Sequence, residues 1–133
     1  MFVLPSTPAY TELHCHSAFS FLDGASLPEE LVVAALDRGH TTLALTDHNT
    51  VSGSMEFAQA AAGLGLRAIH GAEIDVVLPG EHADSPSHLT LLVRDTRGWR
   101  SLCRLLTLAH RDTRDHTGRA RDPILALTDV LSH

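Results

Sequence analysis

Apolar residues fall into two patterns along the chain, and together they predict alternating strands and helices. Short apolar, β-branched runs indicate strands at residues 9–15, 41–46, 67–69 (with a continuation over 74–78) and 88–93. Apolar residues that recur every three or four positions indicate helices that begin at Ser26 and that span residues 51–62 and 96–110. This order predicts an α/β fold of about four βα units around a parallel sheet.

The predicted helices carry start and stop signals. Ser26 and Glu29 have the spacing of a capping box, with Pro28 in the first turn. Glycines at positions 39, 63 and 65 are expected to end the first two helices. The apolar positions expected to face the core are Met55, Ala58 and Ala62 in the second helix, and Trp99, Leu102, Cys103, Leu106 and Ala109 in the third.

Polar segments separate these elements. Residues 79–86 and 112–122 are expected to be loops, and residues 123–132 are expected to supply one short final element. In a parallel sheet, functional loops follow the carboxyl ends of the strands. We therefore expect the chemistry of the protein at that edge.

His14 and His16 lie at the end of the first predicted strand. Side chains two residues apart on a strand point to the same face, so Cys15 points to the other face and is expected to pack in the core. Two imidazoles on one face form half of a site for a divalent metal ion. Taken alone, the pair is equally compatible with two surface histidines.

Further histidines and carboxylates follow the next predicted strands. They are Asp23 after the first strand, Asp47 and His48 after the second, His70 and Glu73 after the third, and His88 at the start of the fourth. Carboxylates can bridge metal ions that imidazoles cap, and two or three ions held in this way can bind a phosphate and generate a hydroxide nucleophile. The sequence therefore predicts a multi-metal site.

Charge and composition sharpen this picture. The 133 residues include ten histidines, and all ten basic residues are arginine. Residues 1–93 hold two arginines and eleven acidic residues, whereas residues 94–133 hold eight arginines and five acidic residues. An acidic, histidine-rich body suits cations. The arginine-rich end is either a solvated helix face or a contact for DNA or another protein domain.

Several classes of protein are excluded. No run approaches the roughly 18 apolar residues of a membrane span, and no basic segment opens a signal peptide. Two cysteines are too few for a disulfide scaffold. We therefore expect a cytoplasmic protein that does not contact a membrane.

Four motifs, LHCHS (residues 13–17), FLDG (21–24), LTDH (45–48) and HGAE (70–73), resemble those of the PHP (polymerase and histidinol phosphatase) family. From residue 10 to about residue 111 the chain resembles the N-terminal PHP domain of bacterial DNA polymerase III alpha subunits. YTELH (10–14) and FSFLDG (19–24) are closer to the error-prone branch, and SMEF (54–57) and HLTLLV (88–93) also match.

The resemblance implies a distorted (β/α)7 barrel with up to three divalent metal ions, typically zinc, manganese or iron. By the matching motifs, His14 and His16 would bind one metal, Asp23 and His48 a second, and His88 a third, with Glu73 as a bridge. Asp47 would orient His48 or the local backbone, and His70 would have a structural or supporting role. The remaining histidines, His40, His82, His110, His116 and His133, match no motif and are expected at the surface.

Family members complete the metal centre with later ligands, including a terminal Asp-x-His that is absent here. Residues 1–133 are therefore expected to be the N-terminal portion of a PHP domain, with the rest of the barrel and the polymerase modules absent. Catalysis by this portion alone is an open question.

Three functions remain as alternatives. The first is a metal-dependent phosphoesterase, of the 3′–5′ exonuclease type, in a DNA polymerase that also contacts other polymerase domains or replication and repair subunits. The second is a structural domain that stabilises the polymerase or docks a proofreading subunit. The third is a stand-alone phosphatase similar to histidinol phosphatase.

Overall fold

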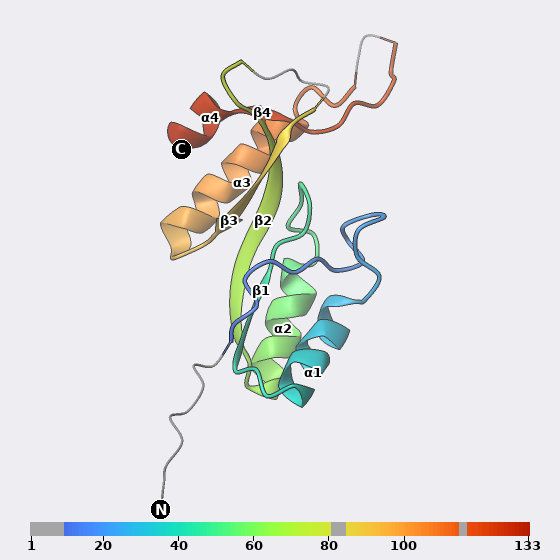
Figure 1. Ribbon diagram of the computed structural model, residues 1–133, viewed down its shortest axis with the longest axis vertical. Helices are drawn as coiled ribbons and strands as arrows, with labels where there is room; N and C mark the ends of the chain where they lie inside the picture. Colours follow the sequence, from blue (N-terminus) through green and yellow to red (C-terminus); the bar gives the residue numbers. More distant parts are fainter. Residues whose placement is uncertain (1–9, 81–84, 115–116) are drawn as a thin grey trace, which may run out of the picture.

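The computed structural model describes residues 10–80, 85–114 and 117–133 (Figure 1). Its central element is the long strand β2 (Arg67–Val77), which pairs with every other strand. β1 (Thr42–Leu45) runs parallel to its first half. β3 (Ser87–Leu92) runs antiparallel to its second half, and β4 (Leu125–Ala126) runs parallel beside its end. The predicted α/β class is confirmed.

The predicted fully parallel sheet is wrong at β3. Residues 78–86 join β2 to β3, and this connection is shorter than the crossover of about a dozen residues that parallel neighbours need. Residues 70–73, which were expected to follow the third strand, instead continue β2 without a break. Gly71 permits this, since a Cβ atom there would collide with the backbone carbonyl of Leu91 on β3.

The predicted first strand is reduced to a single bridge between Glu12 and Leu43. Ala9, where that strand was expected to begin, lies outside the described residues. The segment nevertheless runs beside β1, because the amides of Ala44 and Thr46 donate to the carbonyls of Glu12 and Cys15, each at 2.9 Å.

Helices α1 (Pro28–Asp37) and α2 (Ser54–Leu64) lie side by side next to β1 (Figure 1). Their shared core contains Val32, Ala35, Leu43, Leu45, Phe57, Ala61 and Leu66. The predicted face of α2 is wrong, because Met55 and Ala62 are exposed while Phe57 is buried.

The predicted helix ends need two corrections. The capping box is wrong because α1 starts one residue later than expected, with Leu27 as its N-cap, and Glu30 rather than Glu29 accepts from the Leu27 amide at 2.8 Å. Gly63 lies inside α2, and Gly65 ends the helix with a φ of 78°. Gly39 follows α1 with a φ of 79°, as a C-terminal stop requires.

Helix α3 (Thr96–His110) has the predicted bounds and covers the other half of β2. Asp95 caps it by accepting from the Gly98 amide at 2.8 Å. Leu102, Leu105, Leu106 and Ala109 pack against Ala72, Ile74 and Val76 of β2. After α3, the chain supplies two short elements, β4 and α4 (Leu127–Leu131), where one was predicted.

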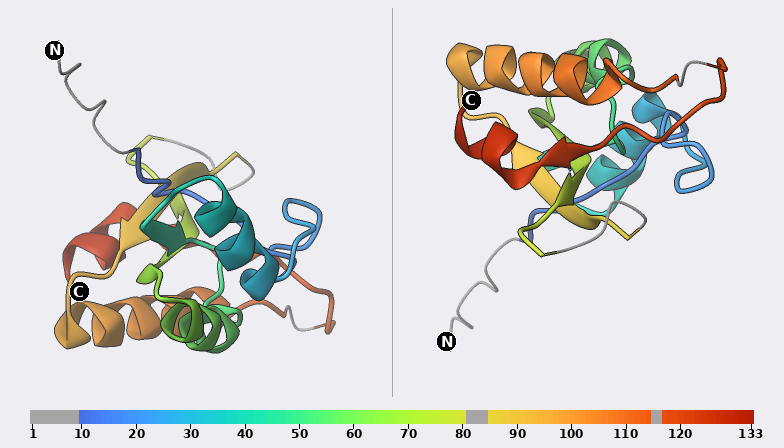
Figure 2. Two further views of the ribbon diagram at one scale, coloured as in Figure 1. Left: turned by 90° about the horizontal axis from the view of Figure 1, so that it is seen from below. Right: turned by 90° about the horizontal axis from the view of Figure 1, so that it is seen from above.

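Figure 2 shows α2 and α3 on the same side of the sheet. His70 of β2 lies between them. Its ring is edge-to-face with the rings of Phe57 and Trp99, at centroid distances of 5.6 Å and 5.8 Å. Its Nδ1 atom is buried and has no hydrogen-bond partner in the described part of the chain. The segments of known placement contain no helix long and apolar enough to cross a membrane.

The packing of His70 predicts a pH dependence of stability. Burial lowers the pKa of His70 below its ordinary value, so the unfolded chain takes up this proton first as the pH falls. The stability that the protein gains from burying the neutral His70 ring is therefore fully present above about pH 7 and is lost as the pH falls toward 5. Denaturant titrations at pH 7 and pH 5 should show a smaller loss of unfolding free energy for His70→Gln than for wild type. Equal losses would contradict this assignment.

Candidate metal centre

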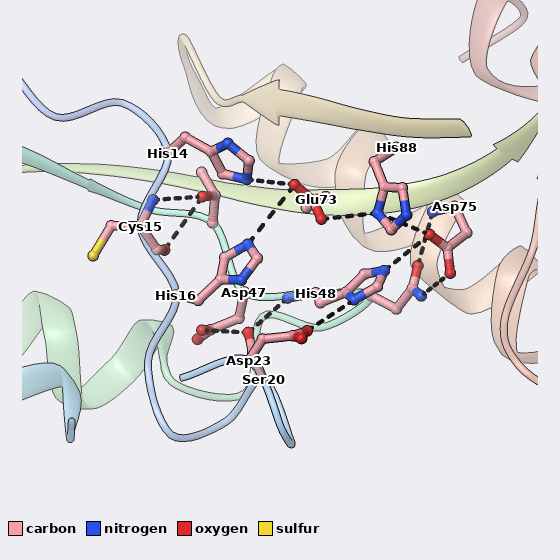
Figure 3. A network of polar contacts seen from close by, with 12 residues as sticks. His14, Cys15, His16, Ser20, Asp23, Asp47, His48, Glu73, Asp75 and His88 are labelled. Atoms are coloured by element: carbon pink, nitrogen blue, oxygen red, sulfur yellow. Dashed lines mark hydrogen bonds and ion pairs between the residues drawn. The ribbon is translucent and has the colours of Figure 1, made fainter. Parts of the chain in front are cut away.

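The segment before α1 carries His14 and His16 to the sheet. Its two hydrogen bonds to β1 fix the backbone on either side of these residues, and the two imidazole rings lie 5.0 Å apart between centroids. Cys15 points away from them (Figure 3) and packs against the core beside α1 and α2. Burial raises the pKa of the Cys15 thiol, which agrees with the expected packing role.

The loop after His16 is tied to the end of β1 by the carboxylate of Asp47, which is 1% exposed. Asp47 accepts from the Ser17 amide at 2.6 Å, from the Ser17 hydroxyl at 2.8 Å and from the Ser20 hydroxyl at 2.9 Å. Ser20 in turn accepts from the His48 amide at 2.9 Å. Gly24 closes the loop where a Cβ atom would collide with the Ser17 carbonyl. Asp47 thus fixes the local backbone around His48.

The central strand β2 supplies two buried carboxylates, Glu73 and Asp75, each 7% exposed. They alternate with the core residues Ala72, Ile74 and Val76, so they lie on the opposite face of the strand. Asp75 was missed by the sequence reasoning. The same spacing of two that paired His14 with His16 would have paired it with Glu73, had residues 70–73 been assigned to a strand.

Glu73 lies between histidines that come from different elements (Figure 3). One oxygen, Oε2, contacts Nε2 of His14 and lies 3.8 Å from Nε2 of His16. The other, Oε1, lies 3.0 Å from Nδ1 of His88 on β3. The antiparallel register of β2 and β3 brings His88 to this position, since it pairs with Asp75.

His48 lies between two carboxylates, one at each ring nitrogen. Its Nε2 is 2.9 Å from Oδ1 of Asp75, which is also 3.4 Å from Nδ1 of His88. Its Nδ1 is 3.2 Å from Oδ2 of Asp23. Asn49 holds Asp75 from the other side by donating to Oδ2 at 3.0 Å and accepting from its amide at 3.2 Å.

The described residues form two groups whose ligand atoms lie within 4.8 Å of one another. The groups are His14, His16 and Glu73, and His48, Asp75 and His88. Imidazole and carboxylate together suit zinc, manganese or iron. Nε2 of His16 is buried and has no hydrogen-bond partner among the described residues, so a metal ion would satisfy an otherwise unpaired atom. The residues present therefore fit divalent metal ions.

The electrostatics of the second group favour a cation. Burial disfavours the protonated form of His48, but the hydrogen bonds to Asp75 and Asp23 and the negative charges of Asp75 and Glu73 outweigh it, so the pKa of His48 is raised. The same negative charges attract a metal ion, which would displace that proton.

Two candidate site residues lie outside both metal-binding groups. His70 points to the α2 and α3 side of β2, away from the metal-binding groups, and its role is in packing. Asp23 approaches His48 but lies outside both groups. Of the histidines expected at the surface, His110 is exposed yet donates from Nε2 to the Asn49 carbonyl at 2.7 Å. His82 and His116 lie outside the described residues.

A pocket of about 590 Å³ opens beside the second group. Its lining includes Asp23, His48, Asp75, Phe19 and Phe21. Carboxylates, an imidazole and aromatic residues thus line the same pocket. A small anion bound to metal ions in the centre would therefore have an adjoining space for a larger substituent.

The family to which this chain belongs follows from its similarity to known protein families. The sequence profile of the PHP domain matches residues 12–131. The chain belongs to the PHP domain family. The predicted resemblance is thereby confirmed.

Error-prone DNA polymerases are similar to this PHP chain. The enzyme of Mycobacterium tuberculosis is 46% identical over 128 residues, which cover 94% of the chain and 12% of the enzyme. The enzyme of Cutibacterium acnes is 42% identical over 134 residues, which cover 96% of the chain and 12% of the enzyme. The PHP chain therefore spans about an eighth of the length of these relatives.

Two solved structures resemble the PHP chain. A putative metal-dependent phosphoesterase from Bifidobacterium adolescentis has a TM-score of 0.57 and 29% identity, and the match covers 80% of this chain and 37% of that one. An amidohydrolase from Chromobacterium violaceum with bound sulfate has a TM-score of 0.61 and 33% identity, with coverage of 76% and 33%. These matches agree with a partial TIM-like barrel.

The Asp47 network predicts an effect on metal affinity from a residue that does not face the ligands. Asp47→Asn replaces one of the two oxygens that accept from Ser17 and Ser20 by an NH2 group, which cannot accept a hydrogen bond. We expect the affinity for Zn²⁺ to fall by about 10–100-fold, as for other residues that orient ligands. Isothermal titration calorimetry measures this change. Asp37→Asn, at the exposed end of α1, is the matched control, and an equal loss in both variants would contradict the assignment.

Proposed function

We propose that this chain is the N-terminal portion, residues 1–133, of a PHP domain that hydrolyses phosphoester bonds with the help of divalent metal ions. The observation that supports this most directly is the buried carboxylate of Glu73, whose two oxygens face His14 and His16 of the N-terminal segment and His88 of β3. A carboxylate in this position can join two cations, and paired cations are a recurring arrangement in phosphoester hydrolysis.

The proposed ligands fall into two sets that share Glu73. His14 and His16 hold the first cation, and His48, Asp75 and His88 hold the second, with each set drawn from one of the observed groups. Asp23 is proposed to accept from Nδ1 of His48 and thereby orient its ring. Zinc, manganese and iron all suit this donor set, and later residues of a complete barrel would add a third ion.

Bound divalent ions would supply positive charge to a phosphate and acidify a water molecule. The chain itself supplies the scaffold on which this chemistry depends. β2 fixes Glu73 and Asp75 on a buried strand, Asp47 fixes the loop beside His48, and Asn49 fixes Asp75. Such a rigid set of donors is what electrostatic catalysis requires, because the ligands need not reorganise during the reaction.

The proposed setting is a DNA polymerase of the error-prone type, in which the domain removes nucleotides in the 3′–5′ direction. The sequence identity of 46% and 42% to the error-prone polymerases of Mycobacterium tuberculosis and Cutibacterium acnes supports this setting. Its partners would be DNA and further polymerase domains or repair subunits, and its compartment the bacterial cytoplasm. The exposed arginines of α3, Arg97, Arg100 and Arg104, suit a nucleic-acid backbone or an acidic protein surface.

The ligand assignment predicts different effects of two carboxylate substitutions. Asp75→Asn removes a proposed ligand and is expected to lower the number of Zn²⁺ ions bound per chain. Asp23→Asn removes only an orienting partner and is expected to keep that number while weakening affinity by about tenfold or more. Equilibrium dialysis followed by metal analysis measures both quantities. The reverse result would exchange the roles of the two residues.

Hydrolysis is tested in the natural polypeptide that carries this sequence. We expect it to degrade labelled single-stranded DNA only with a divalent metal present, and we expect a His14→Ala/His16→Ala double variant to lose at least about 100-fold in rate. His40→Ala, which alters a histidine bonded to the Tyr10 carbonyl, is the matched control. Metal binding that raises the melting temperature, with no hydrolysis in the wild type, would favour the structural alternative.

A further inference from the structure

The lining of the pocket beside the metal-binding groups includes two aromatic residues that have no role in the proposed hydrolysis. Phe19 and Phe21 line the pocket together with His48 and Asp75. Phe21 is 87% exposed, so its side chain is accessible to a ligand. In Figures 1 and 2, the loop that carries these rings lies on the same side of the molecule as the loop that follows α3.

The loop before α1 keeps the side chain of Phe21 exposed to solvent instead of burying it in the core. The Ser17 and Ser20 contacts with Asp47 and the close approach of Gly24 to the Ser17 carbonyl fix both sides of the loop. Leu22, next to Phe21, has a φ of 72°, an unfavourable backbone conformation that the surrounding contacts must maintain. The exposed ring is therefore part of a well-defined loop conformation.

The charges of the pocket determine what it can bind. Asp23, Asp75 and Asp122 line the pocket, and the described residues that line it include no arginine. These carboxylates repel an anion unless cations are bound. A phosphate would therefore lie on the metal side, and a flat, uncharged group on the Phe19 and Phe21 side.

We propose that Phe19 and Phe21 form a subsite that stacks the base of an unpaired terminal nucleotide whose phosphate lies at the metal-binding groups. A base inside a duplex is stacked and paired, so only an unpaired end can present its face to these rings. Stacking on an aromatic ring tolerates every base, because each has a π-face. The inference rests on the proposed phosphoester hydrolysis and adds to it the residues that would bind the base of the terminal nucleotide.

The experiment compares three probes on the Zn²⁺-loaded chain: dAMP, 2-deoxyribose 5-phosphate, which lacks the base, and inorganic phosphate. In the wild type, calorimetric titration should show dAMP binding about tenfold tighter than 2-deoxyribose 5-phosphate. The protons of the bound adenine should also shift upfield in NMR spectra, because they lie over an aromatic ring. Zn²⁺ is suitable because it is diamagnetic.

Phe21→Ala should remove the preference for dAMP while the affinities for inorganic phosphate and Zn²⁺ stay unchanged, and Phe21→Tyr should restore the preference. Met55→Ala, which truncates an exposed apolar residue of α2, is the matched control. Unchanged preference for dAMP in Phe21→Ala would overturn the subsite and would leave the exposed ring as a contact for another protein segment. Absence of binding of all three probes would overturn the proposed hydrolysis itself, and the subsite with it.

Discussion

The carboxylate of Asp47 is the constraint on which the centre depends. It is almost completely buried, and three donors from the loop after His16 satisfy it. A buried charge with this many hydrogen bonds is stable only in one arrangement of its partners. Together with the hydrogen bonds that the amides of Ala44 and Thr46 donate to Glu12 and Cys15, these contacts hold the N-terminal segment in place. His14 and His16 therefore face Glu73 from a segment that is fixed on both sides.

The two faces of strand β2 have different roles: one packs in the core, and the other carries acidic side chains. Its apolar face packs beneath α3, and its other face presents Glu73 and Asp75 to histidines from the N-terminal segment, the end of β1 and β3. Two acidic side chains on one buried face repel each other, and divalent cations offset that repulsion. The elements that would be least stable without metal ions are thus those that the ions would join.

The sequence pattern predicted much of this arrangement because its signals are local. The bounds of α3 follow from its apolar period and the cap at Asp95, and the pairing of His14 with His16 follows from strand alternation. The errors concern features that depend on distant contacts. Residues 70–73 continue the strand because they pair with β1 and β3, contacts that the local pattern does not contain, and Asp75 was missed for that reason. The exposure of Met55 likewise reflects where α1 lies, which the period of α2 alone cannot specify.

Gly71 shows how a residue without a side chain can set the dimensions of a site. It lies in the same strand as Glu73, and its lack of a Cβ atom lets the Leu91 carbonyl of β3 approach β2 closely. His88 lies on that same strand, three residues away from Leu91. A methyl group at position 71 would push β3 outward and widen the gap between His88 and the carboxylates of β2. The spacing between β2 and β3, and hence the distance between His88 and the carboxylates of β2, therefore depends on the lack of a side chain at position 71.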